Sequence, residues 1–235
     1  VHYEILLSSQ KNDNFARLSR NVTKSSSIRC LVTAGPTREW LDPVRFLSNP
    51  STGKMGFAVA DAAHERGWDV DLISGPVTLD IKSGVRRTFV ETADEMLAAC
   101  LDLFASCDFV IMAAAVCDHK PALFAKSKLK KSEISTILEL EQTPDILAEL
   151  GRRKASGQNL VGFAAETNDC LSNGERKLRE KNLDWIVVND VSLPECGFAS
   201  DFNEVTLLGR NGEIVPVDLA PKLEVARILL ERIDS

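Results

Sequence analysis

The chain has 235 residues, of which 44% are hydrophobic and 26% charged, the makeup of a globular protein that can bury a full core. Its formal net charge of −6 argues against a general affinity for nucleic acid, because proteins that bind the phosphate backbone normally carry a basic excess. No apolar run approaches the roughly 20 residues that a membrane-spanning helix needs.

The first residues and the cysteines suggest where the folded domain begins and in which compartment it works. Residues 8–27 are rich in Ser, Asn, Lys and Arg without any period, so we expect a flexible leader over residues 1–27 and one domain over residues 28–235. The six cysteines contain no C-x-x-C pair, and several lie in apolar runs, which predicts buried thiols in a reducing cytoplasm. A catalytic cysteine is a weaker interpretation, since the chain has only three histidines to activate one, and a histidine or cysteine metal site has no better support.

Short apolar runs alternate with helical segments along the chain. Residues 28–34 form such a run, stopped by Gly35 and Pro36, and residues 69–74 repeat the pattern after a helix over 57–66. Two strands joined by one helix form a right-handed βαβ unit.

The alternation continues to the end of the chain. We expect strands near 87–90, 109–116, 134–140, 160–166 and 184–190. We expect helices over 93–104, after Pro144 with Thr143 as the N-cap, around Lys177, and over 222–233. Residues 204–208 and 214–217 are expected to form a hairpin. The pattern predicts an α/β fold: a Rossmann-like, doubly wound three-layer sandwich with a mostly parallel sheet and a C-terminal hairpin.

The loop over residues 42–56 is the first functional clue. It carries Arg45, Asn49, two hydroxyl residues, Gly53 and Gly56, and it leads into a helix, whose free N–H groups and positive dipole end suit a phosphate. It matches neither a Walker loop nor the glycine fingerprint of dinucleotide-binding proteins. From spacing alone, an ordinary strand-to-helix connection is an equally good interpretation.

Other polar residues are expected at the same sheet edge. The alanines at 113–115 would let a ligand approach the backbone, although close packing against a helix explains them equally well. The four lysines within residues 126–131 form the densest positive patch, which could also be ordinary solvated surface. The following residues all fall at or after the carboxyl ends of proposed strands, which favours a single site: Arg45, Asn49, Gly53, Asp118, Lys128, Phe163, Lys177 and Lys181.

From about Cys30 to the C-terminus the chain resembles the phosphopantothenate–cysteine ligase family, also called phosphopantothenoylcysteine synthetase, of coenzyme A biosynthesis. The resemblance is carried by ordered segments at matching distances: residues 33–39 (TAGPTRE), 42–45 (DPVR), 49–56 (NPSTGKMG), 114–118 (AAVCD), 128–131 (KLKK), 162–167 (GFAAET) and 188–190 (VND). It departs from the family pattern at Pro36, Pro50 and Thr52, none of which is a proposed catalytic group.

The resemblance implies a two-step ligation. The carboxylate of 4′-phosphopantothenate would attack the α-phosphate of CTP, giving an acyl-cytidylate and pyrophosphate, and the amine of cysteine would then displace CMP to form the amide. Bacterial members resemble CTP users, and Mg²⁺ would bridge the triphosphate. The resemblance also implies a homodimer with a shared active site, and no nucleic-acid or membrane partner. Many bacterial members are fused behind a flavin-dependent decarboxylase, and decarboxylation is not expected from this chain.

The resemblance also assigns roles to residues. Asn49 and Arg45 would hold the acyl carbonyl, and Lys128 would close over the phosphates during activation. The substrate-binding set is Arg45, Asn49, Ala114, Ala115 and Asp118. The nucleotide-binding set is Gly35, Ser51, Gly53, Gly56, Met112, Ala113, Ala114, Asp118, Lys128, Thr143, Pro144, Asp145, Ile146, Phe163, Lys177 and Lys181.

Two competing hypotheses remain. A nicotinamide-dependent reductase would share the sheet architecture, but the glycine fingerprint is missing and Tyr3, the only tyrosine, lies in the leader, so no Tyr-x-x-x-Lys pair is possible. A non-catalytic nucleotide-binding module is the other hypothesis. The combination of Asn49, Arg45 and Lys128 weakens it.

Overall fold

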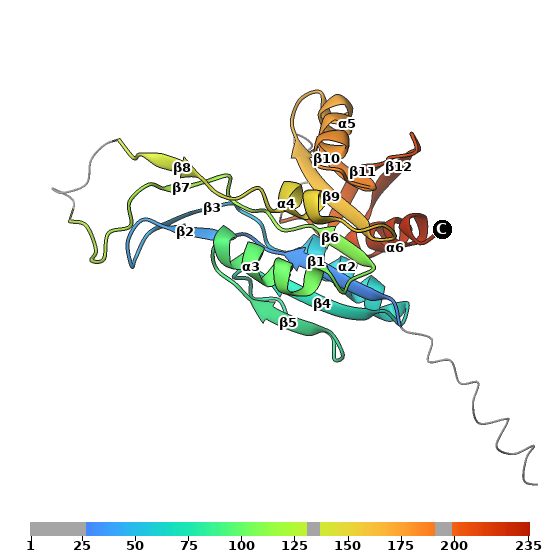
Figure 1. Cartoon of the computed structure of the whole chain (residues 1–235), viewed down its shortest axis with the longest axis horizontal. Coiled ribbons are helices and arrows are strands. Elements are labelled where there is room, and N and C mark those ends of the chain that lie inside the picture. The colour runs from blue at the N-terminus through green and yellow to red at the C-terminus, as the bar shows by residue number, and fades with distance from the viewer. Residues whose placement is uncertain (1–26, 131–136, 191–198) are drawn as a thin grey trace, which may run out of the picture.

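The computed structural model describes residues 27–130, 137–190 and 199–235 (Figure 1). The leader predicted over residues 1–27 therefore lies almost entirely outside the described residues, as do residues 134–136 of one predicted strand. None of the described helices combines the length and apolar character needed to cross a bilayer.

An eight-stranded sheet forms the centre of the molecule, with the strand order β12-β11-β10-β9-β6-β1-β4-β5. Strands β1, β4, β5, β6, β9 and β10 are parallel, and the hairpin of β11 and β12 adds to β10 in antiparallel fashion. The bounds of the strands are β1 Arg29–Ala34, β4 Asp69–Ser74, β5 Arg86–Phe89, β6 Phe109–Met112, β9 Asn159–Glu166, β10 Trp185–Asp190, β11 Phe202–Gly209 and β12 Ile214–Pro221. The α/β fold with a mostly parallel sheet and a C-terminal hairpin is confirmed.

Helices cover both faces of this sheet, because successive side chains of a buried parallel strand point to opposite faces and both must be covered by apolar groups. In β1, Cys30 and Val32 face the side covered by α2 and α6, whereas Leu31 faces the side of α3, α4 and α5. The helices span α2 Lys54–Glu65, α3 Ala93–Phe104, α4 Ile146–Arg153, α5 Cys170–Glu180 and α6 Lys222–Ile233.

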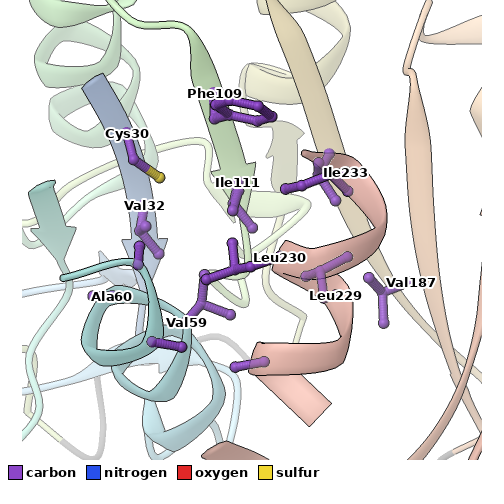
Figure 2. Close-up of a cluster of buried hydrophobic side chains, with 14 of the residues drawn as sticks. Cys30, Val32, Val59, Ala60, Phe109, Ile111, Val187, Leu229, Leu230 and Ile233 are labelled. Carbon is purple, nitrogen blue, oxygen red and sulfur yellow. The ribbon is translucent and has the colours of Figure 1, made fainter. Parts of the chain in front are cut away.

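The core between α2, α6 and the sheet is drawn in Figure 2. Leu230 of α6 lies between Ile111 of β6 and Val59 of α2, and all three side chains are fully buried. The C-terminal helix is thus packed into the centre of the fold. Its helical period predicted its bounds to the residue, because one apolar face is buried along its whole length.

Several predicted elements have other bounds in the structure: the helix predicted over 57–66 spans Lys54–Glu65, and the hairpin strands are longer than predicted. Two differences bear on the site. Strand β6 ends at Met112 instead of residue 116, and Ala115 leaves the sheet to donate its N–H to the carbonyl of Gly35 at 2.9 Å. Helix α4 is capped by Asp145 instead of Thr143, because the Asp145 carboxylate accepts the N–H of Ala148 at 3.0 Å. The Thr143 hydroxyl donates instead to the carbonyl of Cys117.

Two short hairpins extend together from the main body and were not predicted (Figure 1). They pair β2 (Arg38–Trp40) with β3 (Phe46–Ser48) and β7 (His119–Pro121) with β8 (Leu140–Gln142), and we call these four strands the arm. The strand predicted over 134–140 is therefore wrong in its described part, since residues 137–139 are not in a strand and β8 begins at Leu140.

Candidate active site

A cleft of about 710 Å³ opens at the edge where the parallel strands end. Its walls come from the loop before α2, the loop after β6, the start of α4, the end of β9, helix α5 and the start of α6. This is the edge at which open α/β sheets bind ligands, because the loops there diverge and leave space between them.

The loop before α2 supplies a backbone cradle on one side of the cleft. Gly53, the N-cap of α2, has a left-handed φ of 80°, and the Ser51 hydroxyl accepts its N–H at 3.3 Å. A Cβ at Gly56 would lie 2.5 Å from Cβ of Ala34, so only glycine lets α2 approach β1 this closely. The N–H groups of the first turn and the helix dipole therefore face the cleft at a place that suits a phosphate.

Asn49 connects this loop to the loop that follows β6. Its carboxamide donates one hydrogen bond to the carbonyl of Ala115 at 3.1 Å and another to that of Val116 at 3.0 Å. An asparagine side chain has two N–H donors, so both are used to hold this loop. The loop is also held by the hydroxyl of Thr33, which accepts the N–H of Ala114 at 3.2 Å.

Two lysines of the α5 region line the opposite wall. Nζ of Lys177 lies 2.6 Å from Oε1 of Glu166, and Nζ of Lys181 lies 2.8 Å from Oδ2 of Asp145. Desolvation raises the pKa of Asp145, but the hydrogen bonds from Lys181 and the Ala148 N–H outweigh it, so that the net pKa is lowered. Each ammonium group has three N–H donors, so each lysine can bind the phosphate of a ligand while it keeps its carboxylate partner.

The middle of the cleft is less polar. Phe163, Met112, Ile146 and Leu147 offer apolar surface, and the carboxylate of Asp118 lies at the same cleft. Apolar walls with a few polar groups at fixed positions are typical of sites for small organic ligands such as nucleotides.

Most of the residues that the sequence assigned to the site do come together here. The cleft is lined by Asn49, Ser51, Gly53, Gly56, Met112, Ala113, Ala114, Ala115, Asp118, Thr143, Pro144, Asp145, Ile146, Phe163, Lys177 and Lys181. Gly35, Arg45 and Lys128 do not line it. Gly35 has a left-handed φ of 77° and lies behind the cradle, where a Cβ on Gly53 would be 3.4 Å from the Gly35 backbone.

Arg45 and Lys128 lie at the arm instead of the cleft. The Arg45 guanidinium pairs with the buried carboxylate of Asp42, with Nε 3.0 Å from Oδ2. Its Nη2 also donates to the carbonyl of Leu129 at 3.1 Å. The side chain of Lys128, the neighbour of Leu129, is exposed.

Six further polar residues line the cleft that were not assigned to the site from the sequence: Lys54, His119, Gln142, Asn189, Asn203 and Lys222. Nζ of Lys54 lies 2.7 Å from Oδ1 of Asp201, and Nζ of the buried Lys222 donates to the carbonyl of Phe202 at 3.3 Å. Both lysines are the first residues of helices that begin at this sheet edge, and that position is the signal that could have found them.

The described residues provide few side chains that could bind a metal ion together. Within residues 27–130, 137–190 and 199–235, no group of three or more His, Cys, Asp or Glu side chains could hold a metal ion.

Cys30, Cys100, Cys107 and Cys117 are buried thiols, and burial raises the pKa of Cys100 to about 12. A high thiol pKa leaves little thiolate at neutral pH, which argues against a nucleophilic role for Cys100.

The fold and the cleft define an open α/β protein with a ligand site at the carboxyl edge of its parallel strands. The model of the DNA/pantothenate metabolism flavoprotein C-terminal domain family matches residues 26–235, and the chain belongs to this family.

Two curated relatives place the chain more closely. It is 46% identical over 204 residues to the coenzyme A biosynthesis bifunctional protein CoaBC of Bacillus subtilis (strain 168), covering 86% of this chain and 50% of the relative. It is 43% identical over 206 residues to a cysteine/cysteine sulfinic acid decarboxylase of an unknown prokaryotic organism, covering 87% of this chain and 57% of the relative. The chain thus spans about half the length of these curated relatives.

A solved structure covers the domain itself. The crystal structure of the C-terminal domain of a CoaBC protein matches with a TM-score of 0.76 and 42% identity, over 88% of this chain and 94% of that one. These matches confirm the resemblance to the bifunctional coenzyme A biosynthesis family.

Proposed function

We propose that the protein is a ligase that joins 4′-phosphopantothenate to L-cysteine and so forms phosphopantothenoylcysteine in coenzyme A biosynthesis. The observation that carries the proposal is the cleft, which brings together Asn49, Asp118, Phe163, Lys177 and Lys181 from four separate parts of the chain. The kinship with the CoaBC proteins supports it.

The reaction has two steps that both develop negative charge. First, a carboxylate oxygen of 4′-phosphopantothenate attacks the α-phosphorus of CTP and pyrophosphate leaves. Second, the amine nitrogen of cysteine attacks the acyl carbon, CMP leaves and a proton is lost. Positioned N–H groups and cations are what such steps need, because the new charge forms on phosphate and acyl oxygens.

The cleft offers a place for each part of the nucleotide. The cradle of Ser51, Gly53 and Gly56 suits the phosphates, and Lys177 and Lys181 supply positive charge on the opposite wall. Phe163 and Met112 offer apolar surface for the base. Mg²⁺ would be held chiefly by the triphosphate oxygens, since the described residues provide no metal cluster of their own.

Asn49 is proposed to bind the acyl oxygen of the substrate. Because both of its N–H groups now hold the carbonyls of Ala115 and Val116, one of them must exchange its carbonyl for the acyl oxygen. The remaining hydrogen bond would keep the side chain in position during the exchange.

A homodimer would account for the position of Arg45. Arg45 does not line the cleft of its own chain, and the arm that carries it exposes apolar side chains, including Phe46 at 40% and Phe124, beside the arm, at 57%. Exposed apolar side chains grouped on an extension are typical of protein interfaces. We propose that a second copy covers the arm and that Arg45 reaches the partner's cleft, in a cytoplasmic enzyme.

The test is pyrophosphate release by the purified chain with 4′-phosphopantothenate, cysteine and Mg²⁺, comparing CTP with ATP. Release that depends on phosphopantothenate, with the amide product identified by mass spectrometry, would support the ligase and identify the nucleotide. A folded protein that binds CTP in a thermal-shift assay without turnover would contradict the ligase and favour a nucleotide-binding module.

A further inference from the structure

We propose that Asp42 is a positioning residue for Lys128: with Arg45 it forms a latch that grips the Leu129 peptide and fixes the lysine segment, residues 125–130, to the turn between β2 and β3. The part of this inference that concerns catalysis rests on the proposed ligase function. The part that concerns the latch stands on geometry alone.

The carboxylate of Asp42 is fully buried, and its two oxygens have different partners. Oδ1 accepts the N–H groups of Val44 at 2.8 Å and Arg45 at 2.9 Å, which shapes the turn itself. Oδ2 accepts Nε of Arg45 at 3.0 Å and the N–H of Leu129 at 3.2 Å. Oδ1 therefore binds only the turn, whereas Oδ2 joins the Arg45 side chain of the turn to Leu129, a residue 87 positions away in the sequence.

The Leu129 peptide is held on both sides. Its N–H donates to Asp42, and its carbonyl accepts Nη2 of Arg45 at 3.1 Å. A further hydrogen bond joins the N–H of Ala125 to the carbonyl of Leu41 at 2.9 Å. Three hydrogen bonds thus fix the lysine segment to the turn.

Lys128 lies directly before the gripped peptide, and its own side chain is exposed. Fixing a lysine on a ligand costs both backbone and side-chain conformational entropy. A backbone that is already held in place removes the first of these costs, so less free energy is needed to bring the Lys128 charge to a phosphate. The latch provides this position through the backbone and leaves Nζ available. Because the same Asp42 oxygen binds Arg45, the latch also couples the two basic residues that the ligase mechanism needs outside the cleft.

The substitution Asp42→Asn separates the two functions of this side chain. The amide can keep its oxygen on the N–H groups of Val44 and Arg45, so the turn remains. Its NH₂ group then faces the N–H of Leu129 and the Arg45 guanidinium, which are both donors, so the latch is lost.

Limited trypsinolysis tests the latch without reference to activity. We expect cleavage after Lys126, Lys128 or Lys130 to be about tenfold faster in Asp42→Asn than in the wild type, as loss of one or two partly buried hydrogen bonds predicts. The control is Asp94→Asn, which removes the 2.8 Å ion pair with Lys120 but leaves the latch intact. Equal cleavage rates in Asp42→Asn and wild type, both with a native circular dichroism spectrum, would overturn the latch.

A double-mutant cycle with Lys128→Gln tests the catalytic part. In the wild-type background, Asp42→Asn should slow the pyrophosphate burst about tenfold, and in the Lys128→Gln background it should have little further effect, because both changes remove the same contribution. Fully additive effects would refute a role through Lys128. If the chain shows no ligase activity at all, the proposed function fails, while the trypsin result still decides the latch.

Discussion

The amide nitrogen of Asn49 lies 3.0 Å from the backbone carbonyl of Val116 and thereby joins the loop before α2 to the loop after β6. The two loops both line the cleft. The Asn49 side chain therefore helps to set the spacing between them.

Replacing Asn49 with aspartate is therefore expected to impair the second step of the reaction. A carboxylate cannot donate to the carbonyls of Ala115 and Val116, and it would repel the developing acyl oxyanion. We expect turnover of the acyl-nucleotide intermediate to fall at least about tenfold, measured by single-turnover formation of the amide. The same change at Asn211, in the exposed turn of the β11–β12 hairpin, is the control. Wild-type rates for Asn49→Asp would remove Asn49 from the mechanism.

Lys128→Gln should mainly slow the activation step. The neutral side chain cannot stabilise the charge that develops on the phosphates, so the pyrophosphate burst should be slower by about tenfold or more, with a smaller change in CTP binding. Lys126→Gln removes the same charge two positions earlier, from another exposed lysine, and is the control. An unchanged burst in Lys128→Gln would count against the proposed role.

Gly56→Ala should destabilise the protein, although alanine is the better helix former. Its Cβ would lie 2.7 Å from the carbonyl oxygen of Thr33 as well as too close to Ala34. Overpacking of this kind costs about 1–3 kcal/mol, against about 1 kcal/mol gained from helix propensity. The midpoint of urea unfolding should be lower than in the wild type. Nucleotide binding, measured separately, should be weaker. A higher midpoint would mean that α2 can shift away from β1.

The stability contribution of Asp42 should disappear in acid. Hydrogen bonds from Arg45 and from backbone N–H groups outweigh desolvation and hold the pKa of the Asp42 carboxyl well below its usual range. A lowered folded-state pKa stabilises the fold above the unfolded-state pKa of about 4, and this contribution is lost as the pH falls below that value. The difference in unfolding free energy between wild type and Asp42→Asn should therefore shrink between pH 6 and pH 3. A difference that does not change with pH would contradict this assignment.

Cys100 should resist alkylation in the native protein. Its thiol is fully buried, and its pKa is raised to about 12. Iodoacetamide at pH 7.5 should label the half-buried Cys170 before Cys100, and Cys100 only in urea, as followed by peptide mass spectrometry. Early labelling of Cys100 would indicate local opening of α3.

The sequence predicts the elements whose signals are local. The helix over residues 93–104 matches α3 to the residue, because Thr92 and Glu95 form a capping box that fixes its start. Strand β4 also matches to the residue, since its apolar run is bounded on both sides by polar or turn-forming residues. The strands of the arm were missed because each has three residues, too few for any period to show.

The cleft residues that were predicted follow parallel strands, and one that was missed lies where strand direction reverses. Asn203 lies at the start of β11, which runs antiparallel to β10, so its beginning reaches the edge where the other strands end. A search of strand ends cannot find such a residue. The positions of Arg45 and Lys128 were not predictable either. They depend on the contact of Arg45, in the turn between β2 and β3, with Leu129, which lies 84 residues further along the chain.

The cleft is lined by residues from Asn49 to Lys222, nearly the whole length of the domain. No short fragment of the chain contains it, so the cleft forms only when segments that are far apart in the sequence have assembled. A ligand that binds there recognises the folded state alone, and mass action converts its binding into global stability, about 2.7 kcal/mol at a hundred times its Kd. Each substrate of such an enzyme would therefore stabilise the entire folded domain. The rise in melting temperature that a substrate causes would report how tightly it binds.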